Sequence, residues 1–405
     1  MLTESKKLFL QAVNAALKNE YVDWEEPISR EYWEEIFKLA EIHRMLPMVF
    51  QAVYRCPAAR AADAQLMTRY RFGSMQMVAL QAQKTAEFAP VLEALRQAEV
   101  QPLVVKGITC RELYPNPDHR LSSDEDVLIH PAAFARCHQA LTALGFSTRD
   151  PEDMSYELSY LKQGSPLYLE IHRSLFPPES LAYGDLNRFF PDVYGRSVEK
   201  RGVPTLCPTD HMVFLLCHAF KHFLHSGFGL RQVCDLILFS NHYGPEVDWT
   251  YVLECCRSIH AEQFAAGLFR IGWKYLNFSL EDSRFPLQWQ AIYVDEGPLL
   301  EDILQAGIYG TEDEDRLHSS NITLQAVIAQ KQGTSGSGSL LQTVFPPRDV
   351  MERKYPYLKN KPLLLPIAWT DRIIRYGKSS SRASSTLRIG NERVALLKRY
   401  GVITE

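Results

Sequence analysis

The stretch Val104–His130, VVKGITCRELYPNPDHRLSSDEDVLIH, decides the fold, because it joins a short apolar run to two aspartates that open a second apolar run. The valine-rich run 100–105 predicts a short strand, and Gly107 permits a tight turn into a helix over 108–113. The free backbone N–H groups of a helix N-terminus favour phosphate. The expected phosphate ligands of this turn are Lys106, Gly107 and Thr109.

Two acidic residues mark the start of the second apolar run. In a strand, residues i and i+2 share a face, so Asp124 and Asp126 are expected to point the same way and Glu125 to the other side. Two neighbouring carboxylates repel each other unless a cation lies between them, and Mg²⁺ is bound in this way together with substrate phosphates. The alternative interpretation is a solvated turn that leads into a strand.

A third carboxylate is found in SPLYLEIHRS, residues 165–174, where apolar and polar residues alternate. This period of two predicts a half-buried strand with Leu169 and Ile171 on the buried face. If the strand lies beside the one that carries Asp126, Glu170 joins the aspartates and His172 lies on the same side. Three such carboxylates can hold two Mg²⁺ ions. Glu170 could otherwise be an ordinary exposed strand residue.

These residues resemble the nucleotidyltransferases of the DNA polymerase β superfamily. The pattern K-G-x-T…R-x-S-x-D-x-D, shared with abortive-infection toxin nucleotidyltransferases, is matched by Lys106, Gly107, Thr109, Arg120, Ser122, Asp124 and Asp126. A closer likeness is to an uncharacterised bacterial nucleotidyltransferase family, through L-E-I-H at 169–172 and H-A-F-K-H at 218–222. The resemblance spans about residues 101–239, and Gly107-Ile108 replaces the usual Gly-Ser or Gly-Gly doublet.

The resemblance implies an enzyme that transfers a nucleoside monophosphate from an NTP to an acceptor hydroxyl and releases pyrophosphate. The implied catalytic and metal-binding residues are Asp124, Asp126 and Glu170. The implied nucleotide-binding residues are Lys106, Gly107, Thr109, Arg120, Ser122, His172, His218, Lys221 and Arg231. The cofactor would be Mg²⁺, with Mn²⁺ as the alternative, and the partners would be an NTP and an acceptor that the sequence does not identify.

A predicted helix over about 209–225 carries an unusual polar stripe. Its histidines, spaced so that they fall on one helical face, are His211, His218, His222 and His225. We expect this face to border the nucleotide, with Lys221 meeting the triphosphate as a point charge. A zinc site and a solvated stripe are the alternatives. In the next helix, Arg231 and Asp235 are spaced for an ordinary salt bridge, whereas the resemblance places Arg231 against phosphate and Asp235 behind it.

The composition limits the class of protein. A net charge of −4 gives no global basic signature and argues against a dedicated nucleic-acid binder. The eight cysteines include no C-x-x-C pair and are expected to be reduced. No apolar run approaches the ~20 residues of a membrane span, so we expect a cytoplasmic protein that does not bind a membrane.

The expected fold class is α+β, a polymerase-β-like nucleotidyltransferase core of mixed sheet and helices embedded in helical N- and C-terminal segments. The expected divisions are a helical N-terminal segment 1–98, the core 99–205, a helical segment 206–280 that completes the nucleotide site, and a C-terminal helical region 281–405 with a flexible loop at 333–339.

Two further functions remain open from the sequence. A nucleotide-binding regulatory or scaffold protein would keep the fold with little turnover; the intact carboxylates argue against it, and the incomplete glycine doublet favours it. A toxin-like enzyme acting on tRNA would need a basic groove beside the carboxylates, for which Arg111, His119, Arg120 and Arg173 are available.

Overall fold

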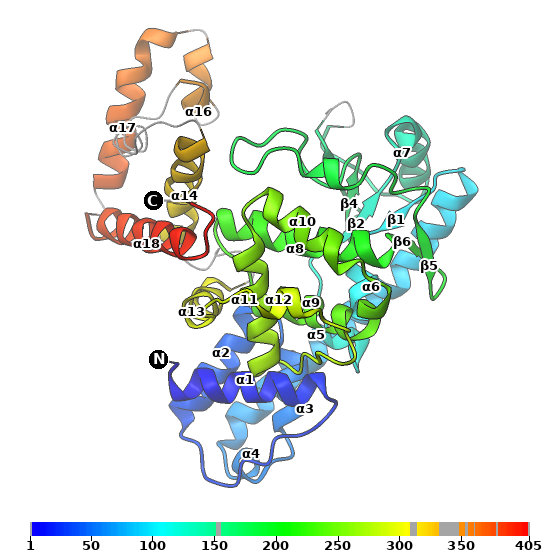
Figure 1. Cartoon of the computed structure of the whole chain (residues 1–405), viewed down its shortest axis with the longest axis vertical. Coiled ribbons are helices and arrows are strands. Elements are labelled where there is room, and N and C mark those ends of the chain that lie inside the picture. The colour runs from blue at the N-terminus through cyan, green and yellow to red at the C-terminus, as the bar shows by residue number, and fades with distance from the viewer. Residues whose placement is uncertain are drawn as a thin grey trace.

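The computed structural model describes residues 2–150, 155–307, 314–331, 348–352, 355–359, 361–377 and 380–403. The expected flexible loop 333–339 lies outside these residues. The chain folds as a small mixed sheet on one side of a predominantly helical body (Figure 1).

The sheet has four strands in the order β1-β2-β4-β3. These are β1 (Leu103–Val104), β2 (Glu125–Leu128), β3 (Glu157–Leu161) and β4 (Tyr168–His172). Strands β2 and β4 are parallel, whereas β1 pairs antiparallel with β2 and β3 pairs antiparallel with β4. The mixed sheet confirms the α+β expectation. Outside these strands, Ser147 forms an isolated antiparallel bridge with Leu161.

Apolar side chains of the sheet form a core with two helices, α5 (Ala64–Gln97) and α7 (Phe134–Ala143). Val127, Leu169 and Ile171 are fully buried in this core. The alternation in β2 and β4 therefore turns the intervening polar residues to the opposite face of the sheet. Between β1 and β2 lie the short helix α6 (Gly107–Arg111) and the 3₁₀ turn η1 (Pro117–His119), and the 3₁₀ turn η2 (Pro131–Ala133) precedes α7.

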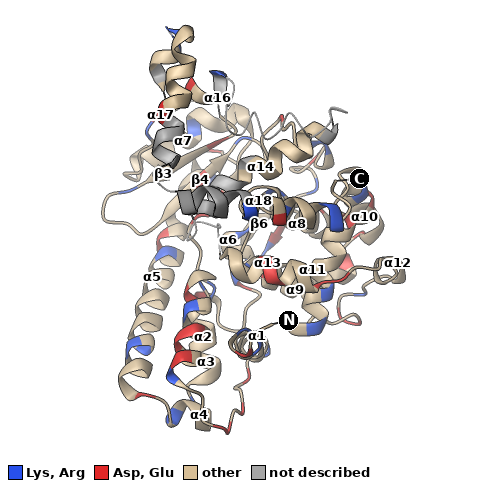
Figure 2. Ribbon diagram, turned by 90° about the vertical axis from the view of Figure 1, so that its left-hand side faces the viewer, with Lys and Arg blue, Asp and Glu red and all other residues tan. Residues whose placement is uncertain are grey.

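The N-terminal helices form a bundle with α5 that projects away from the sheet (Figure 2). They are α1 (Glu4–Leu17), α2 (Arg30–Ile42), α3 (Leu46–Val53) and α4 (Pro57–Arg60). Helices α2 and α3 are separated by a turn at Arg44, whose φ of 51° is left-handed, and Pro47 lies in the first turn of α3. Side-chain caps fix the starts of α1, α2 and α5 at Thr3, Ser29 and Asp63.

A second helical layer covers the other side of the sheet and merges with the N-terminal bundle in one large core. After the hairpin β5 (Val198–Lys200) and β6 (Val203–Thr205), its helices are α8 (Pro208–Leu224), α9 (Leu230–Tyr243), α10 (Trp249–Ser258), α11 (Glu262–Tyr275), α12 (Leu287–Gln290) and α13 (Gly297–Ala306). Helix α8 is buried along almost its whole length, so its few polar side chains must find partners inside the protein.

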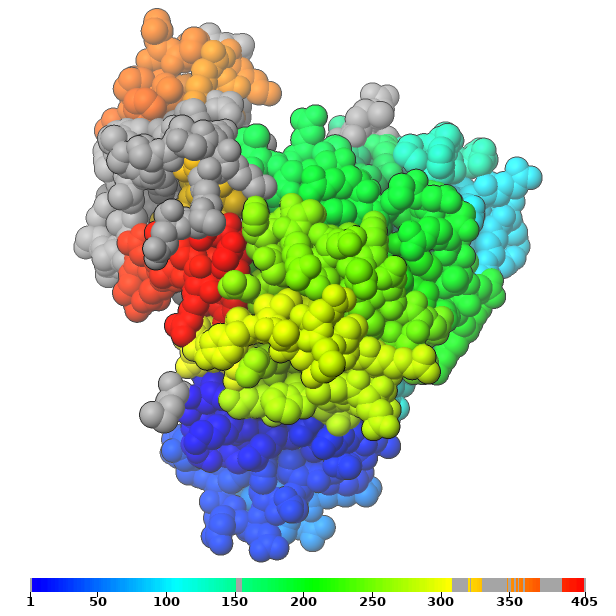
Figure 3. Space-filling model, in the orientation of Figure 1, coloured from blue at the N-terminus to red at the C-terminus, as the bar shows by residue number. Residues whose placement is uncertain are grey.

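The C-terminal helices α14 (Glu314–Lys331), α16 (Arg348–Glu352), α17 (Leu365–Gly377) and α18 (Ser380–Arg399) form the upper-left part of Figure 3. The end of the chain is tied to the body through Tyr400, whose hydroxyl donates to the Asp295 carbonyl at 2.5 Å and accepts from the Leu299 N–H at 3.1 Å. No helix in the described part of the chain is long and apolar enough to cross a membrane.

Candidate active site

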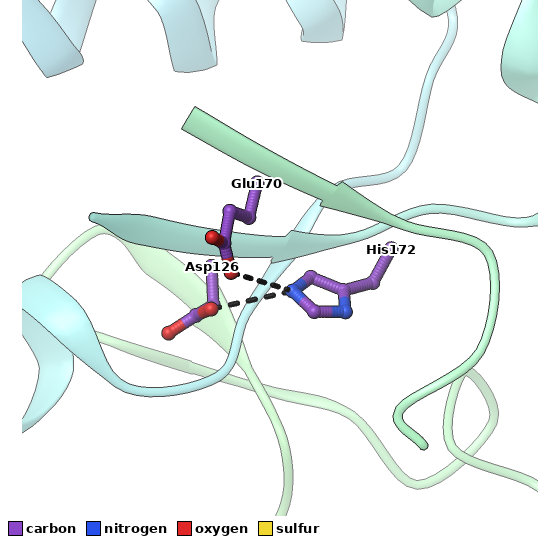
Figure 4. Close-up of side chains that lie close together, drawn as sticks. All are labelled: Asp126, Glu170 and His172. Carbon is purple, nitrogen blue, oxygen red and sulfur yellow. Dashed lines mark hydrogen bonds and ion pairs between the residues drawn. The ribbon is translucent and has the colours of Figure 1, made fainter. Parts of the chain in front are cut away.

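Three potential metal ligands converge on the polar face of the sheet: Asp126 from β2 and Glu170 and His172 from β4 (Figure 4). One ligand atom of each lies within 4.8 Å of the others. The His172 Nε2 atom lies 3.2 Å from Asp126 Oδ1 and 3.9 Å from Glu170 Oε2. Asp126 and Glu170 are paired in the parallel register of β2 and β4. The placement of Glu170 and His172 beside Asp126, expected from the alternation, is therefore confirmed.

Asp124 differs from this expectation. It precedes the first residue of β2 and is half-buried, and it is not part of the group of converging ligand atoms. Its charge still reaches the site, because it contributes to raising the pKa of Glu170. The third converging donor is thus the imidazole of His172 rather than the carboxylate of Asp124.

The two converging carboxyls have different electrostatic surroundings. Burial by itself raises the pKa of Asp126, but Lys106, the His172 hydrogen bond and Lys221 outweigh it and hold this pKa well below its ordinary value. The Lys106 Nζ lies 3.6 Å from Asp126 Oδ2. Burial, followed by the charges of Asp126 and Asp124, raises the pKa of Glu170 to about 8. One group is therefore a stable anion at neutral pH while the other holds a proton when no cation is bound.

Helix α8 borders the site with His218, Lys221 and His222. The His218 Nε2 lies 3.4 Å from Lys106 Nζ and 3.3 Å from His222 Nε2. Burial and the nearby lysine charges lower the pKa of both histidines well below 6.5, so both rings are neutral at pH 7. Lys221 lies with its Nζ 5.9 Å from the Tyr156 ring, and its charge lowers the pKa of Asp126.

The four histidines of the stripe on α8 do not share one surface. His211 is fully buried beside Thr205, with its Nδ1 3.4 Å from the Thr205 hydroxyl, and its ring packs on Phe239. His225 is the C-cap of α8. Only His218 and His222 of the stripe lie next to Lys106 and the carboxylates.

At the turn that is predicted to bind phosphate, a carboxylate of the protein lies at the N-terminus of α6. The Ile108 N–H donates to Glu125 Oε2 at 2.9 Å, and Arg111 forms a buried ion pair with the same carboxylate. Gly107 has a φ of 36°, and a Cβ at this position would overlap the Glu125 carboxylate. The Thr109 hydroxyl donates to the Lys106 carbonyl at 2.5 Å. Gly107 and Thr109 therefore shape the turn around the Glu125 carboxylate.

Three further residues expected to bind nucleotide are buried in structural contacts. Arg120 makes a bidentate ion pair with Asp235, with both distances at 2.7 Å. The Ser122 hydroxyl donates to Glu125 Oε1 at 3.1 Å. Arg231 donates to the Leu121 carbonyl. These side chains are at most 4% exposed, so they lie inside the protein and support the loop that precedes β2.

Two of the four residues expected to form a basic groove for tRNA are buried and ion-paired. Arg111 and Arg120 are each 1% exposed and paired with Glu125 and Asp235. Arg173 lies over the Phe134 ring at 3.9 Å and donates to the Ser155 carbonyl at 2.9 Å. His119 lies on η1, and burial lowers its pKa.

The sequence interpretation missed two side chains at the site. Glu157 on β3 is paired with His172 in the antiparallel register, and its Oε2 lies 3.8 Å from His172 Nδ1. Lys84 on α5 donates to the carbonyls of Ser122 and Ser123 at 2.8 and 3.3 Å, just before Asp124. Glu157 could have been found from the alternation of its strand, whereas the contact of Lys84 spans 38 residues and leaves no local pattern.

The converging residues fit a divalent cation. Asp126 Oδ2 is buried and has no hydrogen-bond partner among the described residues, although Lys106 lies within ion-pair distance. Two carboxylates and an imidazole offer the oxygen and nitrogen donors that such ions use. The sheet therefore presents three side chains that could bind a metal ion beside two lysines.

Comparison with curated proteins and with solved structures finds no match. A family model described as uncharacterised nucleotidyltransferase matches residues 29–276, more than half of the chain. The matched range contains the whole sheet, the converging ligands and the face of α8 that borders them. The chain therefore belongs to this family of nucleotidyltransferases.

Proposed function

We propose that this protein transfers a nucleoside monophosphate from an NTP to an acceptor hydroxyl and releases pyrophosphate. In this proposal residues 99–205 are a polymerase-β-like core, residues 206–280 complete the nucleotide site, and the segments 1–98 and 281–405 support them. The observation that carries the proposal is the convergence of Asp126, Glu170 and His172 beside Lys106 and Lys221.

Asp126 and Glu170 would hold the cation, with Asp124 available to a second ion at the edge of the site. A divalent cation bound there would neutralise the triphosphate and lower the pKa of the attacking hydroxyl. Glu170 would accept the proton of that hydroxyl after the bound cation has displaced the proton that Glu170 holds in the metal-free site.

The triphosphate would be bound by side-chain cations rather than by the N-terminus of α6, which Glu125 fills. Lys106 ion-pairs with Asp126, and we propose that it exchanges this contact for a phosphate when a metal neutralises the aspartate. Lys221 and the neutral rings of His218 and His222 would line the other side. Arg120, Ser122 and Arg231 would act as positioning residues.

The second candidate is a nucleotide-binding regulatory protein with little turnover. The observation that favours it is the Glu125 carboxylate at the N-terminus of α6, because it occupies a backbone donor that could otherwise align a phosphate for transfer and leaves phosphate binding to side-chain cations. The two candidates differ in turnover and not in nucleotide binding.

The test is to incubate the protein with each α-labelled NTP, with Mg²⁺ or Mn²⁺, and with an extract of its host as the source of acceptor. The proposal expects label to move from at least one NTP to a macromolecule or metabolite, and the same reaction with Asp126→Asn to give none. Nucleotide binding without any transfer by the unchanged protein would establish the regulatory candidate instead.

A further inference from the structure

His172 is the donor that distinguishes this centre from an all-carboxylate one. Its Nε2 atom faces both Asp126 Oδ1, at 3.2 Å, and Glu170 Oε2, at 3.9 Å (Figure 4). The side chain is 9% exposed, so burial among its neighbours restricts its orientation. A cation bound by Asp126 and Glu170 thus meets an imidazole nitrogen without rearrangement of the backbone.

The other ring nitrogen of His172 points toward a further carboxylate. Nδ1 is buried and has no hydrogen-bond partner among the described residues, and Glu157 Oε2 lies 3.8 Å away. The antiparallel register of β3 and β4 pairs Glu157 directly with His172. Metal-bound histidines characteristically donate their second N–H to a carboxylate, which fixes the tautomer and strengthens the ligand.

From this arrangement we infer that His172 is a metal ligand and Glu157 its positioning residue, and that the centre selects a first-row transition ion, Mn²⁺, over Mg²⁺. The inference rests on the proposed function, because it concerns the same carboxylates. Mg²⁺ prefers oxygen ligands in a near-ideal octahedron and loses water reluctantly, whereas an imidazole favours transition ions. Among the first-row transition ions, Mn²⁺ is the one that the oxygen ligands of this centre suit best, because Zn²⁺, Fe²⁺, Ni²⁺ and Cu²⁺ favour sites richer in nitrogen or sulfur.

A purely structural role for His172 makes a different prediction. If the ring served only to donate a hydrogen bond to Asp126, a glutamine would replace it, since its amide can donate in the same way. If the ring binds the ion, glutamine exchanges a nitrogen ligand for an oxygen ligand. His172→Gln should then lose Mn²⁺ affinity while Mg²⁺ affinity stays the same or rises.

The inference is tested on the full chain, stripped of metal and without nucleotide. Mn²⁺ binding is followed by electron paramagnetic resonance, and Mg²⁺ binding by its competition with Mn²⁺. We expect His172→Gln and Glu157→Gln each to weaken Mn²⁺ binding about 10- to 100-fold, with little change for Mg²⁺. The matched control is His138→Gln. His138 contacts the Tyr160 hydroxyl in the core on the other face of the sheet, so this substitution should leave both affinities unchanged.

A spectroscopic measurement on the unchanged protein does not depend on whether a variant folds. Electron spin echo modulation from ¹⁴N should appear on Mn²⁺ bound to the unchanged protein and vanish in His172→Gln. Bound Mn²⁺ without nitrogen modulation, or Mg²⁺ bound as tightly as Mn²⁺, would overturn the inference even if nucleotide transfer is normal. Nitrogen modulation without any nucleotide transfer would leave the inference standing and remove the proposed function.

Discussion

Asp126 and Glu170 are paired across the parallel strands β2 and β4, yet their carboxyls have opposite proton affinities. Lys106 and His172 stabilise the charge of Asp126 despite its burial. Within the described residues, Glu170 has no lysine or arginine within ion-pair distance, and the anion of Asp126 adds to the cost of its burial. In the metal-free site Asp126 is therefore ionised and Glu170 is protonated, and binding of a cation should release the Glu170 proton.

The first prediction concerns stability and pH in the metal-free protein. The pKa of Glu170 is raised from 4.5 to about 8 in the folded state, so the folded chain binds a proton that the unfolded chain has lost in this window. The contribution of Glu170 to the free energy of unfolding should therefore fall as pH rises from about 4.5 to about 8, by roughly 2–4 kcal/mol. Chemical denaturation in EDTA at several pH values measures it.

Glu170→Gln is the control for this pH dependence, because glutamine does not titrate. Buried histidines such as His218 and His222 titrate alike in both proteins, so the difference in free energy of unfolding between the unchanged protein and the variant isolates the Glu170 contribution. Identical pH profiles for the two proteins would mean that Glu170 is ionised in the folded state.

Asp126→Asn should abolish metal binding and nucleotide transfer, since it removes the charge of the carboxylate that lies beside Glu170, His172 and Lys106. Repulsion among carboxylates alone would predict a slight rise in Tm. The structure predicts a fall of a few degrees instead, because Lys106 would remain buried without its carboxylate partner. Calorimetry in EDTA distinguishes the two, with the exposed Asp282→Asn as a control that changes neither Tm nor transfer. Full activity in Asp126→Asn would remove Asp126 from the catalytic site.

Gly107→Ala tests the position of Glu125. An alanine Cβ would overlap the buried Glu125 carboxylate in addition to straining a positive φ. Gly164→Ala is the matched control, since Gly164 has a φ of 78° and open space around it. We expect a loss of about 1 kcal/mol in the free energy of unfolding for Gly164→Ala and about 3 kcal/mol or more for Gly107→Ala. Equal losses would show that Glu125 does not occupy the turn.

The sequence predicted the sheet face of the site well because that prediction depended on local periodicity. Alternation in 165–174 placed Leu169 and Ile171 in the core and Glu170 opposite them, and burial of one face then fixes the register. Asp124 escaped the same logic because β2 starts at Glu125, one residue later than the strand assumed for the pair of aspartates.

The residues behind the site could not be assigned from local patterns. Arg120 and Asp235 are 115 residues apart, and nothing in either segment shows that they meet. Likewise, a Lys-Gly turn before a helix looks the same whether its free N–H groups meet a phosphate or an internal carboxylate such as Glu125. Only the tertiary fold decides between an external and an internal partner.

The last prediction concerns Lys221, which separates a catalytic centre from a nucleotide-binding one. Burial lowers its pKa, while Glu157, Asp126 and Glu170 attract its charge, so it lies within electrostatic reach of all three carboxyls. Negative charge on the phosphates is redistributed in the transition state, and a cation placed there contributes more to the transition state than to the ground state. For Lys221→Ala we therefore expect a loss in kcat/KM that exceeds the loss in NTP affinity, by about tenfold or more.

Steady-state kinetics and calorimetric NTP titration measure the two quantities, and the exposed Lys398→Ala serves as the charge-matched control. Equal losses would make Lys221 a group that only binds nucleotide, and unchanged values for both would assign its charge to the stability of the carboxylate cluster.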